Sequence, residues 1–344
     1  MEKKQKLTEL YLLTSFLCLF VVLIHTSSEG VTNLTMGSLQ QKVFFMFNKA
    51  LSFVVPGFIF LSGLKLTYSY QNKKFEFLLF LKKRFTKILI PYICWYIAYY
   101  VFLYHIHFIE AKTIKQHIFS FLIGDLISPF YFITIIFQFY ILFGIFLFLL
   151  KKVNHILLFI ICAVIQLYYL QNIYPMYEDR FFVTYFIYFL LGCLMAEHME
   201  NFQTILKKYK WIVYACFIFF TYWHTTHAYA SNVEGIFYAY WRIFTCLFSI
   251  SGIAAFYCIS CDIVKIAHQK LITLFSILDA SSFYIFLGHC FLLYICNDIW
   301  LRIGLESIFT KFILNSMIVF LGSFFVSFIY VLGKKKWYSI NRKV

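Results

Sequence analysis

Long apolar runs alternate with short polar segments over the whole chain, and each run has about the 20 residues that a helix needs to cross a bilayer. We count ten such runs: 8–27, 44–69, 88–107, 130–150, 155–173, 181–198, 211–229, 236–259, 276–297 and 312–333. The first is too long for the apolar core of a signal peptide and has no small-residue cleavage site after it. The pattern predicts an all-α, polytopic membrane protein of about ten transmembrane helices, forming a single domain over residues 1–344.

Composition supports this class. The 344 residues are 62% hydrophobic and 13% charged, values that exclude a water-soluble domain of this size. The net charge of +15 does not indicate nucleic-acid binding, because the basic residues lie in short segments between the apolar runs. Most of the 30 basic residues fall in every second segment, starting with the N-terminal one, which predicts that both termini are cytoplasmic.

Two segments outside the runs, 71–87 and 112–127, alternate polar and apolar residues and are expected to lie along the inner and outer membrane surfaces. The loop 222–234 is expected outside, with aromatic residues that form an interfacial belt or stack on sugar rings. The ten cysteines are spread through apolar runs, so no disulfide framework is expected. The single C-x-x-C pair, Cys258 and Cys261, lacks a companion at ligand spacing, and we predict no metal site.

His25 ends the first apolar run and is a candidate general base, since an imidazole can take up a proton near neutral pH. The alternative is an interfacial histidine that only hydrogen-bonds a neighbouring helix. Lys49, Lys65 and Arg242 fall inside predicted spans, where charges are costly and usually mark a site. Lys65 is near enough to a span end for its ammonium to reach the interface instead.

Six segments, in order, resemble the integral-membrane acyltransferase 3 family: VVLIHTS at His25, VVPGFIFLSGLKL (54–66), KKRFTKILIPY (82–92), SPFYFITIIFQFYIL (128–142), YFLLGCLMAE (188–197) and SSFYIFLGHCFLLY (281–294). Within the family the chain resembles the intercellular-adhesion membrane protein C group. That group works with poly-N-acetylglucosamine, as its exporter or as an O-succinyltransferase. The resemblance implies an O-acyltransferase that moves acetyl or succinyl from cytoplasmic acyl-CoA to a cell-surface glycan.

The chain departs from the family at one position. The family has an arginine eleven residues before the first-helix histidine, where this chain has Thr14. Eleven residues bring two side chains to one helix face about 16 Å apart. In the family this arginine holds the acyl-CoA donor. Lys65 is expected at about the depth of Thr14 on the next span and could replace that charge, although lysine lacks the fork of arginine.

Acyl transfer needs a base, a donor to the oxyanion and an anion site for the acyl-CoA. Lys49 and Arg242 are expected near the depth of His25, where either could stabilise the oxyanion. Arg84 and Lys87, with Thr14 and Lys65, are candidates for the donor site, although positive-inside charge explains Arg84 and Lys87 equally well. His289, Gln138, Tyr131 and Glu29 are possible supporting residues, of which Gln138 and Tyr131 suit interhelical hydrogen bonds. Glu29, four residues after His25, could orient the imidazole if the helix continued, although Gly30 makes this stretch loop-like.

We expect no bound cofactor, with acyl-CoA as donor substrate. The expected partners are membrane lipid, an extracytoplasmic polysaccharide and a polysaccharide synthase, and the expected location is the bacterial cell membrane. No G-x-S-x-G, P-loop, H-E-x-x-H or G-x-G-x-x-G motif occurs. Two alternatives remain open: a polysaccharide exporter or flippase without acyl chemistry, and an inactive sensor or scaffold, which the missing arginine would suit.

Overall fold

The computed structural model describes residues 7–173, 175–238 and 240–341, with side chains up to Gly333. All regular structure in this part of the chain is helical. The chain divides into two compact units, which we describe separately: the first contains residues 1–54 and 205–344, and the second contains residues 55–204.

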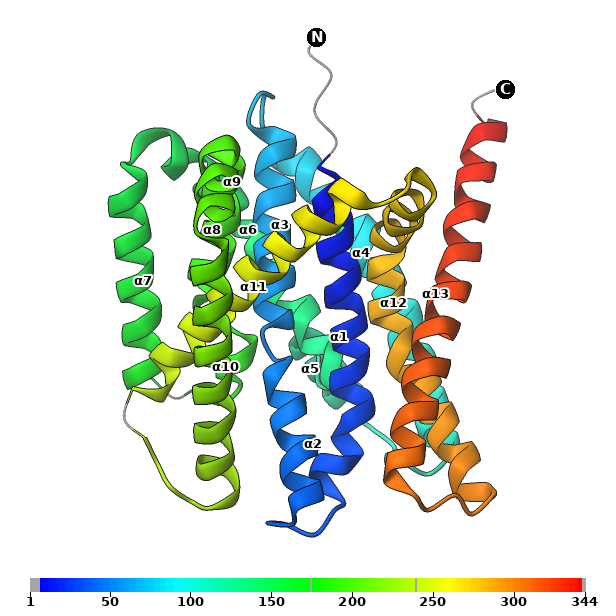
Figure 1. Ribbon diagram of the computed structural model, residues 1–344. Helices are drawn as coiled ribbons and strands as arrows, with labels where there is room; N and C mark the ends of the chain where they lie inside the picture. Colours follow the sequence, from blue (N-terminus) through cyan, green and yellow to red (C-terminus); the bar gives the residue numbers. More distant parts are fainter. Residues whose placement is uncertain (1–6, 174, 239, 342–344) are drawn as a thin grey trace. The chain divides into compact units, whose positions relative to one another are not determined.

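The first unit holds six helices (Figure 1): α1 (Thr8–Thr32), α2 (Leu39–Ala50), α10 (Lys210–Val233), α11 (Trp241–Ile266), α12 (Gln269–Arg302) and α13 (Ile308–Asn341). Helix α1 is central, because it contacts α2, α11, α12 and α13. Phe53 is fully buried and packs edge-on against Phe217 and Phe248 and parallel to Phe256. Aromatic packing of this kind holds α10 and α11 against the end of α2.

The second unit holds the remaining helices: α3 (Val54–Tyr70), α4 (Phe77–His105), α5 (Ile114–Ile123), η1 (Ser128–Phe130), α6 (Tyr131–Lys152), α7 (His155–Asn172), η2 (Glu178–Arg180), η3 (Phe182–Tyr185), α8 (Phe186–Glu197) and α9 (Met199–Lys208). Glycines let α3 and α8 touch backbone to backbone. A Cβ on Gly63 would collide with the carbonyl oxygen of Phe189, and one on Gly192 with that of Phe60. Small residues at such crossings are typical of helices packed in a membrane.

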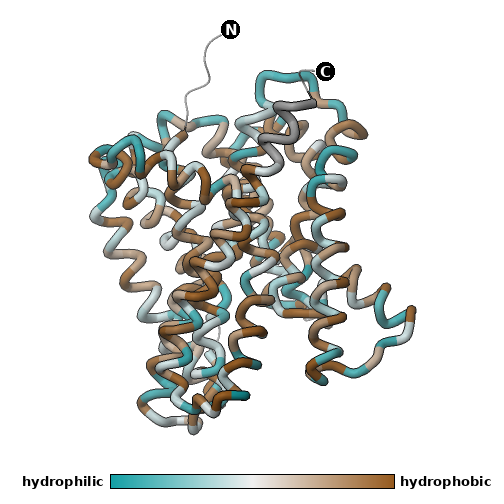
Figure 2. The backbone as a smooth tube through the Cα atoms, turned by 90° about the vertical axis from the view of Figure 1, so that its right-hand side faces the viewer, coloured by the Kyte–Doolittle hydropathy of each residue, from teal (hydrophilic) through white to brown (hydrophobic). Residues whose placement is uncertain are grey.

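Eight helical segments among the described residues are long and apolar enough to cross a membrane, and a ninth is obtained if Phe182–Glu197 and Met199–Lys208, bent by 104°, count as one span. Figure 2 shows apolar residues along most of the length of the long helices. The protein is therefore an integral, multi-pass membrane protein, as the sequence predicts. Of the ten predicted spans, 181–198 is counted only as part of the bent pair, and 211–229, which is α10, is not counted. Its second half carries polar residues such as His224 and His227.

Several predicted boundaries are wrong. The expected span 88–107 begins earlier, because residues 77–87 form the first turns of α4, which continues through Pro91; their expected place at the inner membrane surface stays a prediction. Most of the expected outer loop 222–234 is helical, because α10 runs to Val233. The beginning of α1 and the end of α13 lie at the same end of the first unit (Figure 1), as expected if both termini are on one side of the membrane. The identity of that side stays a prediction.

Candidate functional site

The structure brings His25 of α1 against His289 of α12, with ring centroids 5.1 Å apart and ring planes at 49°. His289 is fully buried, whereas His25 is half-buried. The two histidines are far apart in the sequence and meet because α1 packs along α12. Of the pair, His25 is the one that a substrate could reach.

Hydrogen bonds fix the tautomer of neutral His289. Its Nδ1 lies 2.7 Å from the carbonyl oxygen of Phe286 and 3.1 Å from that of Ile285, so Nδ1 carries the hydrogen. Its Nε2 is therefore an acceptor, and the thiol of Cys290 donates to it at 3.3 Å. Within the described residues, the His25 ring makes no hydrogen bond. His25 thus has a ring nitrogen available to accept a proton, whereas the His289 ring is held by hydrogen bonds within its own helix.

One ring nitrogen of each histidine and the sulfur of Cys290 lie within 4.8 Å of one another. Two imidazoles and a thiol are also ligands that zinc accepts. Nothing in the sequence indicates this grouping, because Cys290 is one more small apolar residue of its run. The three side chains come together only because α1 and α12 are neighbours in the fold.

Polar contacts fix α1 around His25. Asn48 of α2 donates to the carbonyl oxygen of Ile24 at 2.7 Å and to the Ser27 hydroxyl at 3.0 Å. On the other side, the hydroxyls of Thr26 and Ser316 of α13 are 2.9 Å apart. The turn that carries His25 is therefore held from two neighbouring helices, as a catalytic side chain requires.

Glu29 does not lie in a loop, as Gly30 had suggested. Helix α1 continues to Thr32 and includes Gly30, where the ring of Phe44 packs in the place that a side chain would take. The Glu29 carboxylate accepts a hydrogen bond from the Lys311 ammonium at 2.8 Å. The structure therefore pairs Glu29 with α13, and no recorded contact joins it to the His25 ring.

Lys49 lies in the surroundings of a second histidine, His224. It lies near the end of α2, with its ammonium 5.4 Å from the centre of the Phe45 ring, and it acts electrostatically on His224 of α10. No hydrogen bond or ring contact among the described residues joins Lys49 to His25. The role expected for Lys49 beside His25 therefore stays a prediction.

Arg242 lies in the first turn of α11 and not six residues inside a span, because the helix begins at Trp241. The preceding residue, Tyr240, has a φ of 61°, a left-handed conformation that keeps it out of the helix. The Arg242 guanidinium lies 5.8 Å from the centre of the Trp241 ring. It is therefore at a helix end, where charge is less costly than within a span.

The candidate donor residues are divided between the units. Thr14, in the first unit, is 2% exposed and donates to the carbonyl oxygen of Leu10 at 2.8 Å, so its hydroxyl has a local partner. Lys65, in the second unit, is half-buried on α3, five residues before that helix ends at Tyr70. The idea that Lys65 replaces the charge missing at Thr14 stays a prediction.

Arg84 and Lys87 lie on α4 in the second unit. The Arg84 guanidinium is half-buried, 5.4 Å from the ring of Phe80 and 5.8 Å from that of Tyr140 on α6. Lys87 is exposed. This pairing with aromatic faces fixes the Arg84 side chain, and its role toward a donor stays a prediction.

Gln138 and Tyr131 make contacts that stabilise the second unit. The Gln138 amide donates to the carbonyl oxygen of Arg180 at 2.7 Å and accepts from the Phe182 amide at 3.0 Å, which ties η2 and η3 to α6. Tyr131 shares a side-chain hydrogen bond with Tyr185. Their expected interhelical hydrogen bonds are therefore present.

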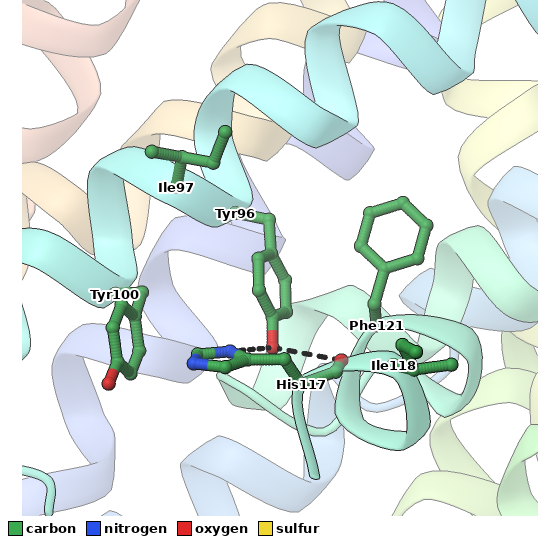
Figure 3. A pocket seen from close by; sticks show the side chains of 6 residues that line it. All are labelled: Tyr96, Ile97, Tyr100, His117, Ile118 and Phe121. Atoms are coloured by element: carbon green, nitrogen blue, oxygen red, sulfur yellow. Dashed lines mark hydrogen bonds between the residues drawn. The ribbon is translucent and has the colours of Figure 1, made fainter. Parts of the chain in front are cut away.

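A pocket of about 320 Å³ lies between α4 and α5, lined by Tyr96, Ile97, Tyr100, His117, Ile118 and Phe121 (Figure 3). The hydroxyl of Tyr96 reaches both Nδ1 and the carbonyl oxygen of His117, each at 3.3 Å, as the dashed lines show. Ile97 and Ile118 are exposed, as for a surface that faces lipid. The pocket contains none of the candidate site residues.

Comparison with known proteins places the chain in a family. A family model described as an acyltransferase domain, acyltransferase 3, matches residues 9–332. Two relatives from Staphylococcus aureus, strains MSSA476 and MRSA252, are each 26% identical over 350 residues, covering 94% of this chain and 89% of the relative. Both are named "Probable poly-beta-1,6-N-acetyl-D-glucosamine export protein". No solved structure matches the chain significantly.

The match runs through both units and includes His25, His289 and all the other candidate residues. The resemblance expected from the six sequence segments is thus confirmed. The chain belongs to the acyltransferase 3 family of integral membrane proteins.

Proposed function

We propose that this protein is a membrane O-acyltransferase that moves an acetyl or succinyl group from cytoplasmic acyl-CoA to an extracytoplasmic polysaccharide, with His25 as the general base. The observation that carries the proposal is the His25–His289 pair. The half-buried His25 ring has no hydrogen bond within the described residues. Its centroid lies 5.1 Å from that of the buried His289 ring, whose Nδ1 donates to a backbone carbonyl oxygen. Family membership supplies the reaction class.

In the proposed reaction, His25 takes the proton of a sugar hydroxyl as its oxygen attacks the acyl carbonyl carbon. The new carbon–oxygen bond forms an ester, the acyl group leaves its carrier, and the proton passes to the leaving group. His289 is a positioning residue: it touches the His25 ring and is itself held by two backbone carbonyl groups. Two charged rings at this distance would repel each other, so the pair suits a single transferable proton.

The negatively charged donor needs cations near the cytoplasmic face. Arg84 and Lys87 of α4 and Lys65 of α3 are the candidates in the second unit. Lysine binds phosphate as a point charge, and arginine binds it through a fork of hydrogen bonds. Under this proposal Lys65 carries the role for which Thr14 lacks a charge.

The test compares the cell-surface polysaccharide of strains with and without the protein by mass spectrometry. The proposal expects the polymer to remain outside the cell while its acyl esters disappear. Purified protein in proteoliposomes, given acyl-CoA on one side and the deacylated polymer on the other, should restore the ester. Esters that persist in the strain without the protein would contradict the proposal.

A polysaccharide exporter is the second candidate. It is favoured by the printed name of the Staphylococcus aureus relatives, which align over 94% of this chain. An exporter predicts a different outcome of the same comparison, because the polymer itself, and not only its ester, would disappear from the cell surface. An inactive scaffold is suggested by Thr14. It predicts that His25 variants, expressed in the strain that lacks the protein, leave the same amounts of surface polymer and of ester as the unmodified protein.

A further inference from the structure

A second buried histidine of the first unit, His224, is part of a hydrogen-bonded chain that the proposed function does not use. Its Nε2 lies 3.2 Å from the Ser52 hydroxyl, and its Nδ1 lies 3.2 Å from the Thr245 hydroxyl. The ring stacks parallel to Phe248, with centroids 4.4 Å apart and an angle of 10°. His224 is 5% exposed, so its position is fixed from all sides.

Two proton arrangements satisfy this chain completely. In one, Ser52 donates to the carbonyl oxygen of Lys49 at 2.7 Å, His224 donates from Nε2 to Ser52, and Thr245 donates to Nδ1. In the other, Ser52 donates to Nε2, Nδ1 donates to Thr245, and Thr245 donates to the carbonyl oxygen of Trp241 at 3.1 Å. The second arrangement directs the serine proton at a histidine that a third group orients. That is the arrangement of an activated nucleophile.

Ser52 is also in a suitable place. It lies in the break between α2 and α3, outside regular helix, and its side chain is half-buried. Lys49, three residues earlier, accepts the Ser52 hydrogen bond at its carbonyl oxygen and so lies on the same turn, which makes its ammonium the candidate to stabilise an oxyanion formed at Ser52. Asn48, one residue before Lys49, is bonded to the carbonyl oxygen of Ile24, next to His25. The segment with Ser52 is therefore anchored to the turn with the proposed base.

We propose that Ser52 is a nucleophile that carries the acyl group as a serine ester between donor and acceptor, with His224 as its base and Thr245 as a positioning residue. This inference rests on the proposed acyl transfer. The Ser52 oxygen attacks the thioester carbonyl carbon, the carbon–sulfur bond breaks, and the serine proton passes through His224 Nε2 to the leaving thiolate. The sugar oxygen then attacks the serine ester, and the sugar proton, taken by His25, ends on the Ser52 oxygen.

The experiment looks for the ester directly. Purified full-length protein is incubated without acceptor, once with acetyl-CoA and once with succinyl-CoA radiolabelled in the acyl group, and is then denatured in acid. Label should remain on the protein, and mass spectrometry should locate it at Ser52. In a separate reaction with unlabelled acyl-CoA and free CoA radiolabelled in its own atoms, the protein should move this label into acyl-CoA, because an acyl-enzyme forms reversibly.

Variants separate a nucleophile from a structural serine. Ser52→Ala should carry no label, whereas Ser52→Cys should carry it as a thioester that neutral hydroxylamine cleaves. His224→Gln should slow labelling by about 100-fold to 10,000-fold, as for the loss of a general base. Thr245→Val should slow it and Thr245→Ser should restore it.

Ser251→Ala is the matched control. Ser251 also donates to a carbonyl oxygen three residues earlier, that of Phe248, at 2.9 Å, but has no recorded histidine partner in the described residues. Its labelling should match that of the unmodified protein. Labelling lost equally in Ser251→Ala would overturn the assignment to Ser52.

The inference and the proposed function fail in different ways. If unmodified protein esterifies the polysaccharide, and Ser52→Ala does so at the same rate without protein-bound label, the serine ester is excluded and acyl transfer stands. If unmodified protein neither acquires label nor esterifies the polysaccharide, both are overturned. Label at Ser52 that chases into polysaccharide on addition of acceptor supports both.

Discussion

The Lys311 ammonium donates to the Glu29 carboxylate at 2.8 Å, which joins the end of α1 to the beginning of α13. Both side chains are mostly buried, with 18% and 22% of their surfaces exposed. This ion pair lies one helical turn beyond His25. The pairing favours a structural role for Glu29, and the orienting role expected from the sequence stays a prediction.

Glu29→Gln should therefore lower stability by about 1 kcal/mol, at the upper end for an isolated ion pair, and leave the rate of ester formation unchanged. Thermal unfolding in detergent and ester assays measure the two effects. The exchange Glu29→Lys with Lys311→Glu should recover stability. A loss of activity in Glu29→Gln without a loss of stability would show that Glu29 acts on His25 after all.

His25→Gln should abolish ester formation, with a loss of about 100-fold to 10,000-fold. Glutamine keeps a hydrogen-bonding side chain of similar reach but cannot take up a proton near neutral pH. The protein should still insert into the membrane, and the polymer should still reach the cell surface. A structural histidine would tolerate this change, so near-normal ester levels would favour the exporter.

The helices of this protein follow closely from its sequence, because each apolar run must become a helix in lipid. The break between α2 and α3 does not, since residues 44–69 read as one uninterrupted run. The structure interrupts the helix at Leu51–Phe53, where Phe53 is buried among aromatic rings of α10 and α11, while Leu39–Tyr70 still forms one candidate span. Packing between distant segments determines the local conformation there. The apolar pattern of residues 44–69 alone does not predict the break.

The same limit explains the site residues. His25 stands out in the sequence as a polar group at the end of an apolar run, and His289 stands out within another. Ser52 and Thr245 do not, because serine and threonine are common in membrane helices and satisfy themselves on nearby carbonyl groups. Only the packing of α10 against α2 and α11 shows that both meet His224.

The crossing of α3 and α8 should be sensitive to a single methyl group. Gly192→Ala should destabilise the protein strongly, because the added Cβ would collide with the backbone carbonyl of Phe60, which cannot move like a side chain. Gly333→Ala is the control: nothing lies within 4 Å of its added Cβ. Alanine is up to about 1 kcal/mol better than glycine in a helix, so Gly333→Ala should be neutral or stabilising. Detergent-resistant folded protein and its unfolding temperature measure both variants.

Lys65→Ala should raise the KM for acyl-CoA more than it lowers kcat, if Lys65 supplies the donor contact for which Thr14 has no charge. An ammonium that binds phosphate acts on the bound donor and not on the reacting carbonyl, so ground-state binding is what its removal weakens. Thr14→Arg in the Lys65→Ala background should lower the KM again, because it returns the cation to the position where the family has it. Thr14→Arg buries a large charged group, since Thr14 is 2% exposed, so folded protein must be quantified alongside. Lys151→Ala is the control, since Lys151 is an exposed lysine at the end of α6 that is no donor candidate, and it should leave the KM unchanged. A KM for acyl-CoA that is unchanged in Lys65→Ala would rule out the replacement and leave Arg84 as the first residue to test in the donor site.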